Sequence, residues 1–320
     1  MKTIITYINE KLKIKKHTDT TFIKTPQQFA DIVMERTSND GTYIDLSNLD
    51  FTEYTENELT EFQSLCDYKS RNKVQTINVT GWVLGNNIHS LSKLFCNLET
   101  LTEVIGFETI DLRKIVTMCG TFQNTGFENI KLTNIDFEHV SRMDSLFAHC
   151  RKLKSVDLSG WNVPGLRLCY KMFSGCNKLE TVEGLNTWQS FEPTEMYEMF
   201  MDCTNLTTVD INNINTSNVI NTLFMFSGCK SLQSIDISKW NIDKLIYTQS
   251  MFYDCIKLET IGDFPTTTNA HLFHYCSCMF MNCIKLKLDL SHITAVNRGH
   301  IQNFSKGTNP KIFKRPRFKI

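Results

Sequence analysis

The amino-acid sequence predicts an α/β solenoid of about ten coils, in which each coil contributes a short helix and a short parallel strand. Three features predict this fold: a phenylalanine that recurs about every 26 residues, an alternating apolar segment downstream of it, and a turn-forming residue two positions after it. A unit of about 26 residues cannot bury its apolar face alone, so successive units must stack on one another. The hydrophobic content of the 320-residue chain, 41%, is sufficient for such a continuous core.

A phenylalanine marks each unit, and successive copies are separated by 27, 25, 26, 27, 26, 26 and 28 residues. The copies are Phe95, Phe122, Phe147, Phe173, Phe200, Phe226, Phe252 and Phe280. In the last six units a cysteine follows three residues later, and a leucine follows three residues after the cysteine. The cysteines are Cys150, Cys176, Cys203, Cys229, Cys255 and Cys283. We interpret them as small buried residues stacked from coil to coil.

A short alternating segment follows each leucine. It reads SVDLS at 155–159, TVDIN at 208–212 and SIDIS at 234–238, and less complete copies lie at 42–48 and 75–82. Alternation with β-branched residues is typical of a strand that faces the core on one side. We therefore expect the apolar residues to point inward and the acidic residue between them to point outward.

The segment before each phenylalanine predicts a short helix, as in INTSNVINTLFMF at 214–226, where Ser217 is a plausible N-cap. The residue two positions after the phenylalanine is always Asn, Asp, His or Gly, the types that tolerate the left-handed conformation. These residues are Asn97, Asn124, His149, Gly175, Asp202, Gly228, Asp254 and Asn282. We expect each of them to end its helix and turn the chain toward the strand.

The repeat MF-x-x-C-x-x-L-x-x-[VI]-D-[LI]-S resembles the BspA-type leucine-rich repeat family, which includes repeats of mycoplasma lipoproteins. The resemblance covers roughly residues 90–292 and is strongest from Phe147 to Leu290. It implies a leucine-rich-repeat-like solenoid used for binding, and it implies no enzymatic activity. The segment MKTIITYINEKL separately resembles peptides that direct internal proteins into the heads of tailed bacteriophages.

Composition and local signals divide the chain into four parts. We expect a basic N-terminal docking segment at 1–24, a capping region at 25–70, the solenoid at 71–297 and a basic tail at 298–320. Thr25, Pro26 and Gln28 predict the start of a helix that covers the first coil. The two ends are basic, while the 34 basic and 34 acidic residues of the whole chain cancel, so the solenoid body is acidic.

The basic tail is interpreted first as a solvated tail. The alternatives are contacts with nucleic acid through phosphates and stacking, with the acidic body, or with another subunit. Its charged residues near the end are Lys311, Lys314, Arg315, Arg317 and Lys319.

The segment H-L-F-H-Y-C-S-C is a weak metal-site candidate, because His271, His274, Cys276 and Cys278 are residue types that bind zinc. The C-x-C spacing differs from the usual C-x-x-C, so an enlarged loop is the simpler interpretation. His149 lies beside Cys150 but occupies the turn position, so no catalytic thiol is predicted. We expect no cofactor, and we expect the twelve cysteines to be reduced.

The outward acidic residues of the strands should form a row along the sheet. The row comprises Asp45, Asp157, Glu183, Asp210, Asp236 and Asp289, and is interrupted by Asn78 and Lys131. Neighbouring carboxylates repel one another, so the row needs hydroxyl donors, cations or a basic partner. It is either a solvated, hydrogen-bonded face or a binding strip for a basic protein segment.

The leading functional hypothesis is a non-enzymatic protein-binding or structural module, in particular a phage-encoded protein associated with the virion. The alternatives are a bacterial surface adhesin and a metal-dependent enzyme at the loop near residue 274. The N-terminus has no pattern of a secretory signal, and no run of 18 apolar residues occurs. We therefore expect a cytoplasmic or virion-associated location, with the cell surface as the alternative.

Overall fold

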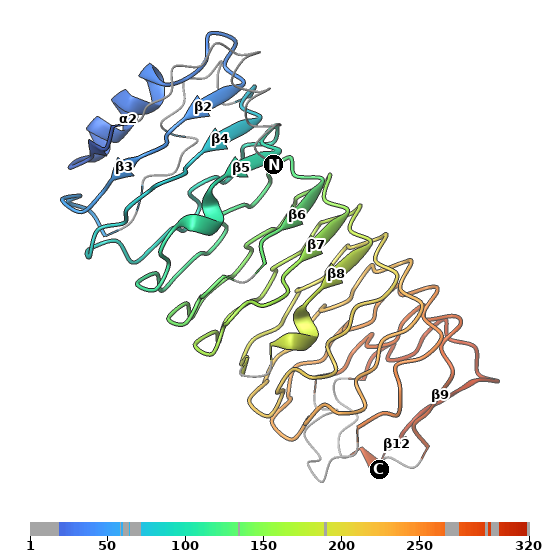
Figure 1. Ribbon diagram of the computed structural model, residues 1–320. Helices are drawn as coiled ribbons and strands as arrows, with labels where there is room; N and C mark the ends of the chain where they lie inside the picture. Colours follow the sequence, from blue (N-terminus) through green and yellow to red (C-terminus); the bar gives the residue numbers. More distant parts are fainter. Residues whose placement is uncertain are drawn as a thin grey trace.

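The computed structural model describes residues 19–57, 59, 64, 72–133, 135–188, 191–265, 275–291, 294–295 and 301–318. Its coils stack side by side from the N-terminal helix α2 to the C-terminal strands, and form a long parallel β-solenoid (Figure 1). The predicted solenoid of about ten coils is thereby confirmed, with much less helix than expected.

The regular elements are short. On one side of the solenoid, β2 (Tyr43–Asp45), β4 (Thr76–Asn78) and β5 (Glu103–Ile105) form one parallel sheet, and β6 (Asn129–Lys131), β7 (Ser155–Asp157) and β8 (Thr181–Glu183) form another. Two-stranded parallel sheets pair β1 (Thr21–Phe22) with β3 (Leu49–Asp50), β9 (Leu288–Asp289) with β11 (Phe313–Lys314), and β10 (Thr294–Ala295) with β12 (Arg317–Phe318). Two 3-10 turns, η1 (Phe107–Thr109) and η2 (Leu185–Thr187), follow β5 and β8.

Helix α2 (Pro26–Glu35) begins as the sequence predicts. The Thr25 side chain accepts a hydrogen bond from the Gln28 backbone N–H at 3.3 Å, and Pro26 occupies the first turn. Phe29, on the buried face of the helix, packs edge-on against the rings of Phe51 and Trp82. The helix therefore covers apolar surface of the first coils.

The expected short helix before each phenylalanine is wrong. In the coil that ends at Phe226, every second backbone N–H donates to the next coil: Thr222 bonds the Tyr247 carbonyl at 2.9 Å, and Phe226 bonds the Met251 carbonyl at 2.8 Å. The N–H groups between them bond back three residues, as from Met225 to Thr222. This pattern satisfies the backbone without the i to i−4 bonds of an α-helix.

The left-handed residue two positions after each phenylalanine is confirmed in all eight units. A second left-handed residue, which the sequence does not reveal, lies two positions before each phenylalanine. These residues are Lys93, Gly120, Ser145, Lys171, Glu198, Phe224, Ser250 and Cys278. Most of them are types without a preference for this conformation, so the stacked coils rather than local propensity hold them there.

The core is a ladder of the repeating phenylalanines. Neighbouring rings from Phe95 to Phe280 lie 5.4–5.7 Å apart between centroids, with interplanar angles of 4–15°. Seven of these eight side chains are entirely inaccessible, and the eighth, Phe122, is 2% exposed. Stacked rings at every step make each coil depend on its two neighbours for burial.

Candidate binding surfaces

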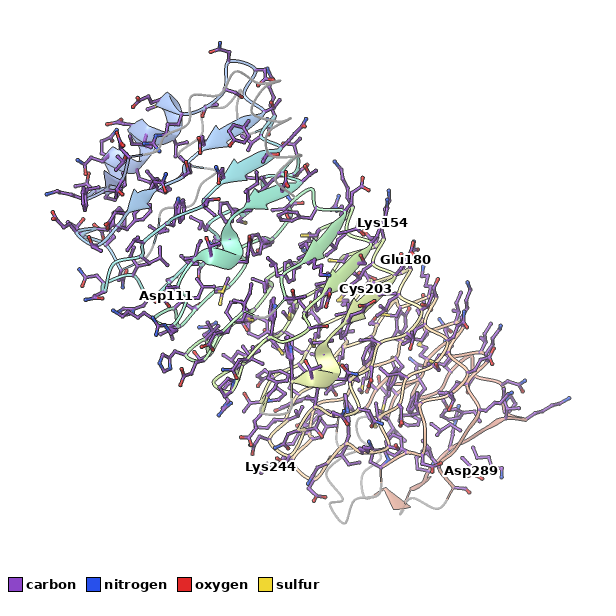
Figure 2. All side chains as sticks on the ribbon, in the orientation of Figure 1. Asp111, Lys154, Glu180, Cys203, Lys244 and Asp289 are labelled. Carbon is purple, nitrogen blue, oxygen red and sulfur yellow. The ribbon has the colours of Figure 1, made fainter. Side chains whose placement is uncertain are left out.

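The cysteines behind the phenylalanines belong to the core. In each of the six units the thiol donates to the carbonyl oxygen of the phenylalanine one coil earlier, as from Cys229 Sγ to Phe200 O at 3.1 Å. Figure 2 shows Cys203, one member of the ladder, inside the coil stack. Burial raises the pKa of Cys150 to about 11 and raises the pKa of the other five thiols further. These thiols stay protonated at neutral pH, which makes them poor nucleophiles.

The structure describes only two of the four residues of the metal-site candidate. His271 and His274 lie outside the described residues, whereas Cys276 is fully buried in the core and Cys278 is partly exposed. Burial raises the pKa of Cys276 to about 12, and its neighbour in the C-x-C pair donates weakly to the Gln302 carbonyl at 3.7 Å. Over the described part of the chain, no three His, Cys, Asp or Glu side chains are grouped as metal ligands.

The C-terminal segment continues the solenoid in its described part. Phe313 packs against the rings of Phe280 and Phe304, and Lys314 forms a salt bridge of 2.7 Å with Asp289. Arg315 Nε donates to the Ser305 hydroxyl at 2.6 Å. Lys311 is exposed, Arg317 lies in β12, and Lys319 is outside the described residues.

The acidic row follows the stacked strands. Register pairs Asp45 with Asn78, Lys131 with Asp157, and Asp157 with Glu183, while Asp289 pairs with Lys314. The row therefore exists along the paired strands, with Asn78, Lys131 and Lys314 at intermediate or terminal positions. Asn78 and Lys131 lie beside carboxylates of the row, whereas Asp157 and Glu183 are direct neighbours, so repulsion is reduced at only some positions.

Most carboxylates of the row also have a role in the turn. One oxygen accepts the backbone N–H two residues later, as from Ser159 to Asp157 at 3.0 Å and from Ser238 to Asp236 at 2.9 Å. These bonds lower the pKa of Asp157 and Asp236. The second oxygen of Asp236 accepts from the Asn212 amide at 2.8 Å, so this carboxylate links two coils. Asp210, Asp236 and Asp289 thus shape their corners and remain exposed. Asp45, which the sequence predicts to point outward, is instead buried, with 5% of its surface exposed.

A different side of the solenoid is rich in tyrosine and carries apolar side chains among polar ones. Isolated parallel bridges connect Arg142, Leu168, Glu195, Asn221, Tyr247 and Tyr275 in successive coils. We define the tyrosine face as three sets of side chains: those of this ladder, those two residues later in each coil, and the exposed Ile220. Its apolar and aromatic members are Leu168, Tyr170, Tyr197, Ile220, Leu223, Tyr247 and Tyr275, all of them partly or substantially exposed.

The tyrosines of this face are stacked in pairs. Tyr170 and Tyr197 lie 4.5 Å apart with an interplanar angle of 10°, and Tyr247 and Tyr275 lie 5.1 Å apart. Burial and the neighbouring Tyr170 raise the pKa of Tyr197 to about 12. Stacking fixes the rings, so little side-chain entropy remains to be lost when a partner covers them.

Three acceptor oxygens on this face are buried and have no donor among the described residues: Asp144 Oδ1, Glu195 Oε2 and Gln249 Oε1. Asp144 is 3% exposed, and its other oxygen is held by Arg142 at 2.8 Å. Desolvation by burial raises the pKa of Glu195. Since buried polar groups without partners are unfavourable, donor groups of a bound molecule would stabilise this face. The sequence analysis did not predict the tyrosine face, although the residues three and five positions before each phenylalanine form it.

Sequence comparison assigns the family. The model of the family described as "Mycoplasma protein of unknown function, DUF285" matches residues 89–208 and 169–293. These overlapping matches together span more than half of the chain, so the chain belongs to this family. The resemblance to the mycoplasma repeats is thereby confirmed, with nearly the boundaries expected from the sequence. No curated protein matches the chain significantly.

Solved structures of bacterial leucine-rich repeat proteins are similar to this chain. A protein from Bacteroides ovatus is 14% identical, with 87% of this chain and 84% of that chain covered and a TM-score of 0.39. A protein from T. pallidum is 17% identical, with 49% and 81% covered and a TM-score of 0.31. One from Eubacterium ventriosum is 14% identical, with 87% and 93% covered and a TM-score of 0.31. The family assignment rests on the family model rather than on these structures.

In the described segments, no helix has both the length and the apolar composition that crossing a membrane requires.

Proposed function

We propose that this protein is a non-enzymatic scaffold that binds another protein on the tyrosine face. The observation that carries the proposal is the contiguous exposure of apolar and tyrosine side chains over successive coils, with Tyr247 40% and Ile220 36% exposed. Tyrosine is enriched at protein interfaces, and exposed apolar patches on soluble proteins commonly mark binding sites. The unpartnered oxygens of Asp144 and Glu195 would accept hydrogen bonds from Lys, Arg or backbone N–H groups of the partner.

The acidic row is a second proposed contact, for a basic segment of the same or another protein. Asp210 and Asp236 support it because both are exposed and neither forms a salt bridge within the described residues. Their amide partners, Asn186 and Asn212, leave the negative charge uncompensated. A basic segment lying across the coils would meet one carboxylate per coil at these two positions.

Affinity capture with purified protein tests both contacts. We expect the Tyr170→Ala/Tyr197→Ala double variant to lose most of the bound partner, while Ile256→Ala/Ile284→Ala, which removes exposed apolar side chains from another edge, retains it. Unchanged capture by the tyrosine variant would reject the tyrosine face. Replacing Asp210 and Asp236 with Asn should weaken capture mainly at low salt, and unchanged affinity would reject the acidic row.

The biological setting is proposed from the sequence alone. The phage-like peptide at residues 1–12, which lies outside the described residues, supports an internal virion protein. The alternative is a bacterial surface adhesin, in keeping with the usual setting of BspA-type repeats. Fractionation distinguishes the two, because recovery at the cell surface would reject the virion role.

Nucleic acid is a further proposed partner of the basic end. Lys314 and Arg315 are engaged with Asp289 and Ser305, so the exposed Lys311 is the described residue best placed for a phosphate. Binding to a labelled oligonucleotide that weakens steeply with salt, and weakens further in Lys311→Ala, is expected. Binding that does not depend on salt would reject this contact.

A further inference from the structure

The parallel sheet is interrupted between β5 and β6. β5 pairs with β4 through Val104 and Ile77, and β6 pairs with β7 through Ile130 and Val156. Over the fully described stretch 101–133, no backbone hydrogen bond joins β5 to β6. Figure 1 shows these two strands as the adjoining ends of two three-stranded blocks.

The coil of β5 leans toward the coil before it. Gly106, directly after β5, has a φ of 83°, and a Cβ at this position would lie 2.6 Å from Thr80 Cα and 2.7 Å from Thr80 N. Only glycine allows so close an approach to the preceding backbone. The coil of β5 is thus in close backbone contact with the coil before it.

The coil of β6 is one residue shorter at its corner. Phe127 and Ile130 lie five and eight positions after Phe122, whereas Leu153 and Val156 lie six and nine positions after Phe147. The shortened corner passes close to the preceding coil at Gly126, where a Cβ would lie 2.4 Å from the Glu99 carbonyl oxygen. The coils thus touch at the corner and separate along the strands.

A cavity of about 430 Å³ lies between β5 and β6. Phe107, Phe122 and Phe127 line it together with Val104, Ile130 and Leu132. Beneath it the core is continuous, because the Phe122 ring stacks at 5.7 Å on both Phe95 and Phe147. Thr102, Glu103, Asn129 and Lys131 also line it, so the cavity is a pocket of mixed polar and apolar lining. Its size suits a small ligand or a side chain.

Both walls of the pocket are strand edges. Glu103 and Ile105 bond β4, so the backbone of Val104 between them faces the pocket. On the opposite wall, Ile130 pairs toward β7, so the backbones of Asn129 and Lys131 face the pocket. Unpaired strand edges are templates for an added strand.

A second glycine break is bridged. Gly184, directly after β8, has a φ of 87°. A Cβ at this position would lie 2.4 Å from Ser159 N, a close approach like that of Gly106 to Thr80. There, however, the Asn186 amide donates to Asp210 Oδ2 at 3.0 Å across the join. Among the described residues, no hydrogen bond spans the edges of β5 and β6 in this way, so the first break is not bridged.

We propose that the β5–β6 break binds an extended segment of a partner protein, with one aromatic or aliphatic side chain in the pocket and its backbone paired to Val104, Asn129 or Lys131. This inference rests on the proposed protein-binding function and adds a site separate from the tyrosine face and the acidic row. The exposed Glu103 and Lys131 lie on opposite walls, so the site selects a segment by shape and backbone pairing rather than by net charge.

A defined peptide panel tests the site in the full chain. The probes are fluorescein-labelled, capped peptides of sequence Thr-Val-X-Val-Thr, with X as Phe, Leu or Ala, measured by fluorescence anisotropy. We expect the Phe or Leu probe to bind at least about tenfold more tightly than the Ala probe, because only these side chains fill the pocket. Methylating the backbone nitrogens beside X should weaken binding by about tenfold or more, since the strand donors are removed.

Matched tryptophan variants locate the binding. Val104→Trp fills the pocket and should abolish binding, whereas Val83→Trp, at a side chain that is 46% exposed elsewhere, should change it less than about twofold. Binding that is indifferent to X or to Val104→Trp, or absent up to about 1 mM probe, overturns the proposal. Self-association abolished by Val104→Trp also overturns it, in favour of a second copy of the chain.

A variant of the tyrosine face distinguishes failure of this inference from failure of the proposed function. Tyr170→Ala/Tyr197→Ala should leave peptide binding intact while reducing capture of the natural partner. If the peptide does not bind but partner capture still depends on those tyrosines, only the inference fails. If the peptide binds and partner capture ignores the tyrosines, only the assignment of the tyrosine face fails.

Discussion

The coils from Phe147 to Phe280 and the join between β5 and β6 are built from the same repeat but differ in continuity. In the regular coils, a cysteine thiol bonds the preceding phenylalanine carbonyl and every phenylalanine ring stacks on the next. At the join, Leu98 and Thr125 occupy the cysteine position, and the strands separate while the rings stay stacked. The phenylalanine core thus stays continuous where the strand pairing on the sheet side is interrupted, and this interruption forms the pocket.

The largest expected effect comes from interrupting the phenylalanine ladder in the regular coils. Phe226→Ala should lower the free energy of unfolding by about 3–5 kcal/mol, because the ring is fully buried between Phe200 and Phe252. Urea unfolding monitored by circular dichroism measures the change. Phe22→Ala, at a ring that is 55% exposed, is the control and should change stability little. Equal effects of the two substitutions would contradict the ladder as the main source of stability.

The ladder is also the part of the fold that the sequence predicts best. A period of 26 residues and the inward phenylalanine, cysteine and leucine follow from residue type alone, and so do the left-handed turns that carry Asn, Asp or Gly. The predicted helix before each phenylalanine is wrong, because the apolar spacing of this segment fits both a helix and a turn that bonds the next coil. Lys171 and Phe224 adopt left-handed conformations against their type, since only the assembled stack favours them.

The binding surfaces were harder to predict. The acidic row follows from strand alternation, and register aligns its paired members, but Asp45 is buried and does not point outward as the sequence predicts. The tyrosine face depends on positions that the sequence analysis assigned to a helix, so its side chains could not be aligned between coils. The pocket depends on a corner that is one residue shorter after Phe122 and on Gly106. Neither feature predicts a pocket from the sequence, because the effect depends on where the strands lie in three dimensions.

Glycines at the coil joins give the next largest effect and test how the sheet is interrupted. Gly184→Ala should destabilise the fold by about 2 kcal/mol or more, because its Cβ would meet the Ser159 backbone, which has no room to move. Gly228→Ala meets the Asp202 side chain instead, at 2.4 Å. Adding Asp202→Ala should therefore recover part of the loss at Gly228. Thermal unfolding of the three variants measures the difference, and full tolerance of Gly184→Ala would show that the close approach at η2 is not needed.

The cysteine ladder should make stability sensitive to alkaline pH. Burial raises the pKa of Cys229 in the folded state, so above a pH of about 9 the unfolded thiol ionises while the folded one stays protonated. The contribution of the thiol is complete below the unfolded pKa and is lost as pH rises, at about 1.4 kcal/mol per pH unit. Cys229→Ala should remove that share of the slope between pH 9 and the folded pKa. Urea midpoints across this range measure it, and an unchanged slope would contradict a buried, protonated thiol.

Substitution of Asp236 should have the smallest effect and separates the turn role of the acidic row from its charge. Asp236→Asn keeps an oxygen for the Ser238 N–H, so it should cost less than about 0.5 kcal/mol at pH 7, whereas Asp236→Ala removes the acceptor and should cost about 1 kcal/mol. The pKa of Asp236 is lowered in the folded state, so its contribution is present above the unfolded pKa and is lost as pH falls through the folded pKa. Asp236→Asn should therefore flatten the acid limb of stability below a pH of about 4, as measured by urea midpoints. Equal costs for Asn and Ala would mean that the carboxylate does not hold the turn, and would leave partner binding as the reason for an acid at this position in the regular coils.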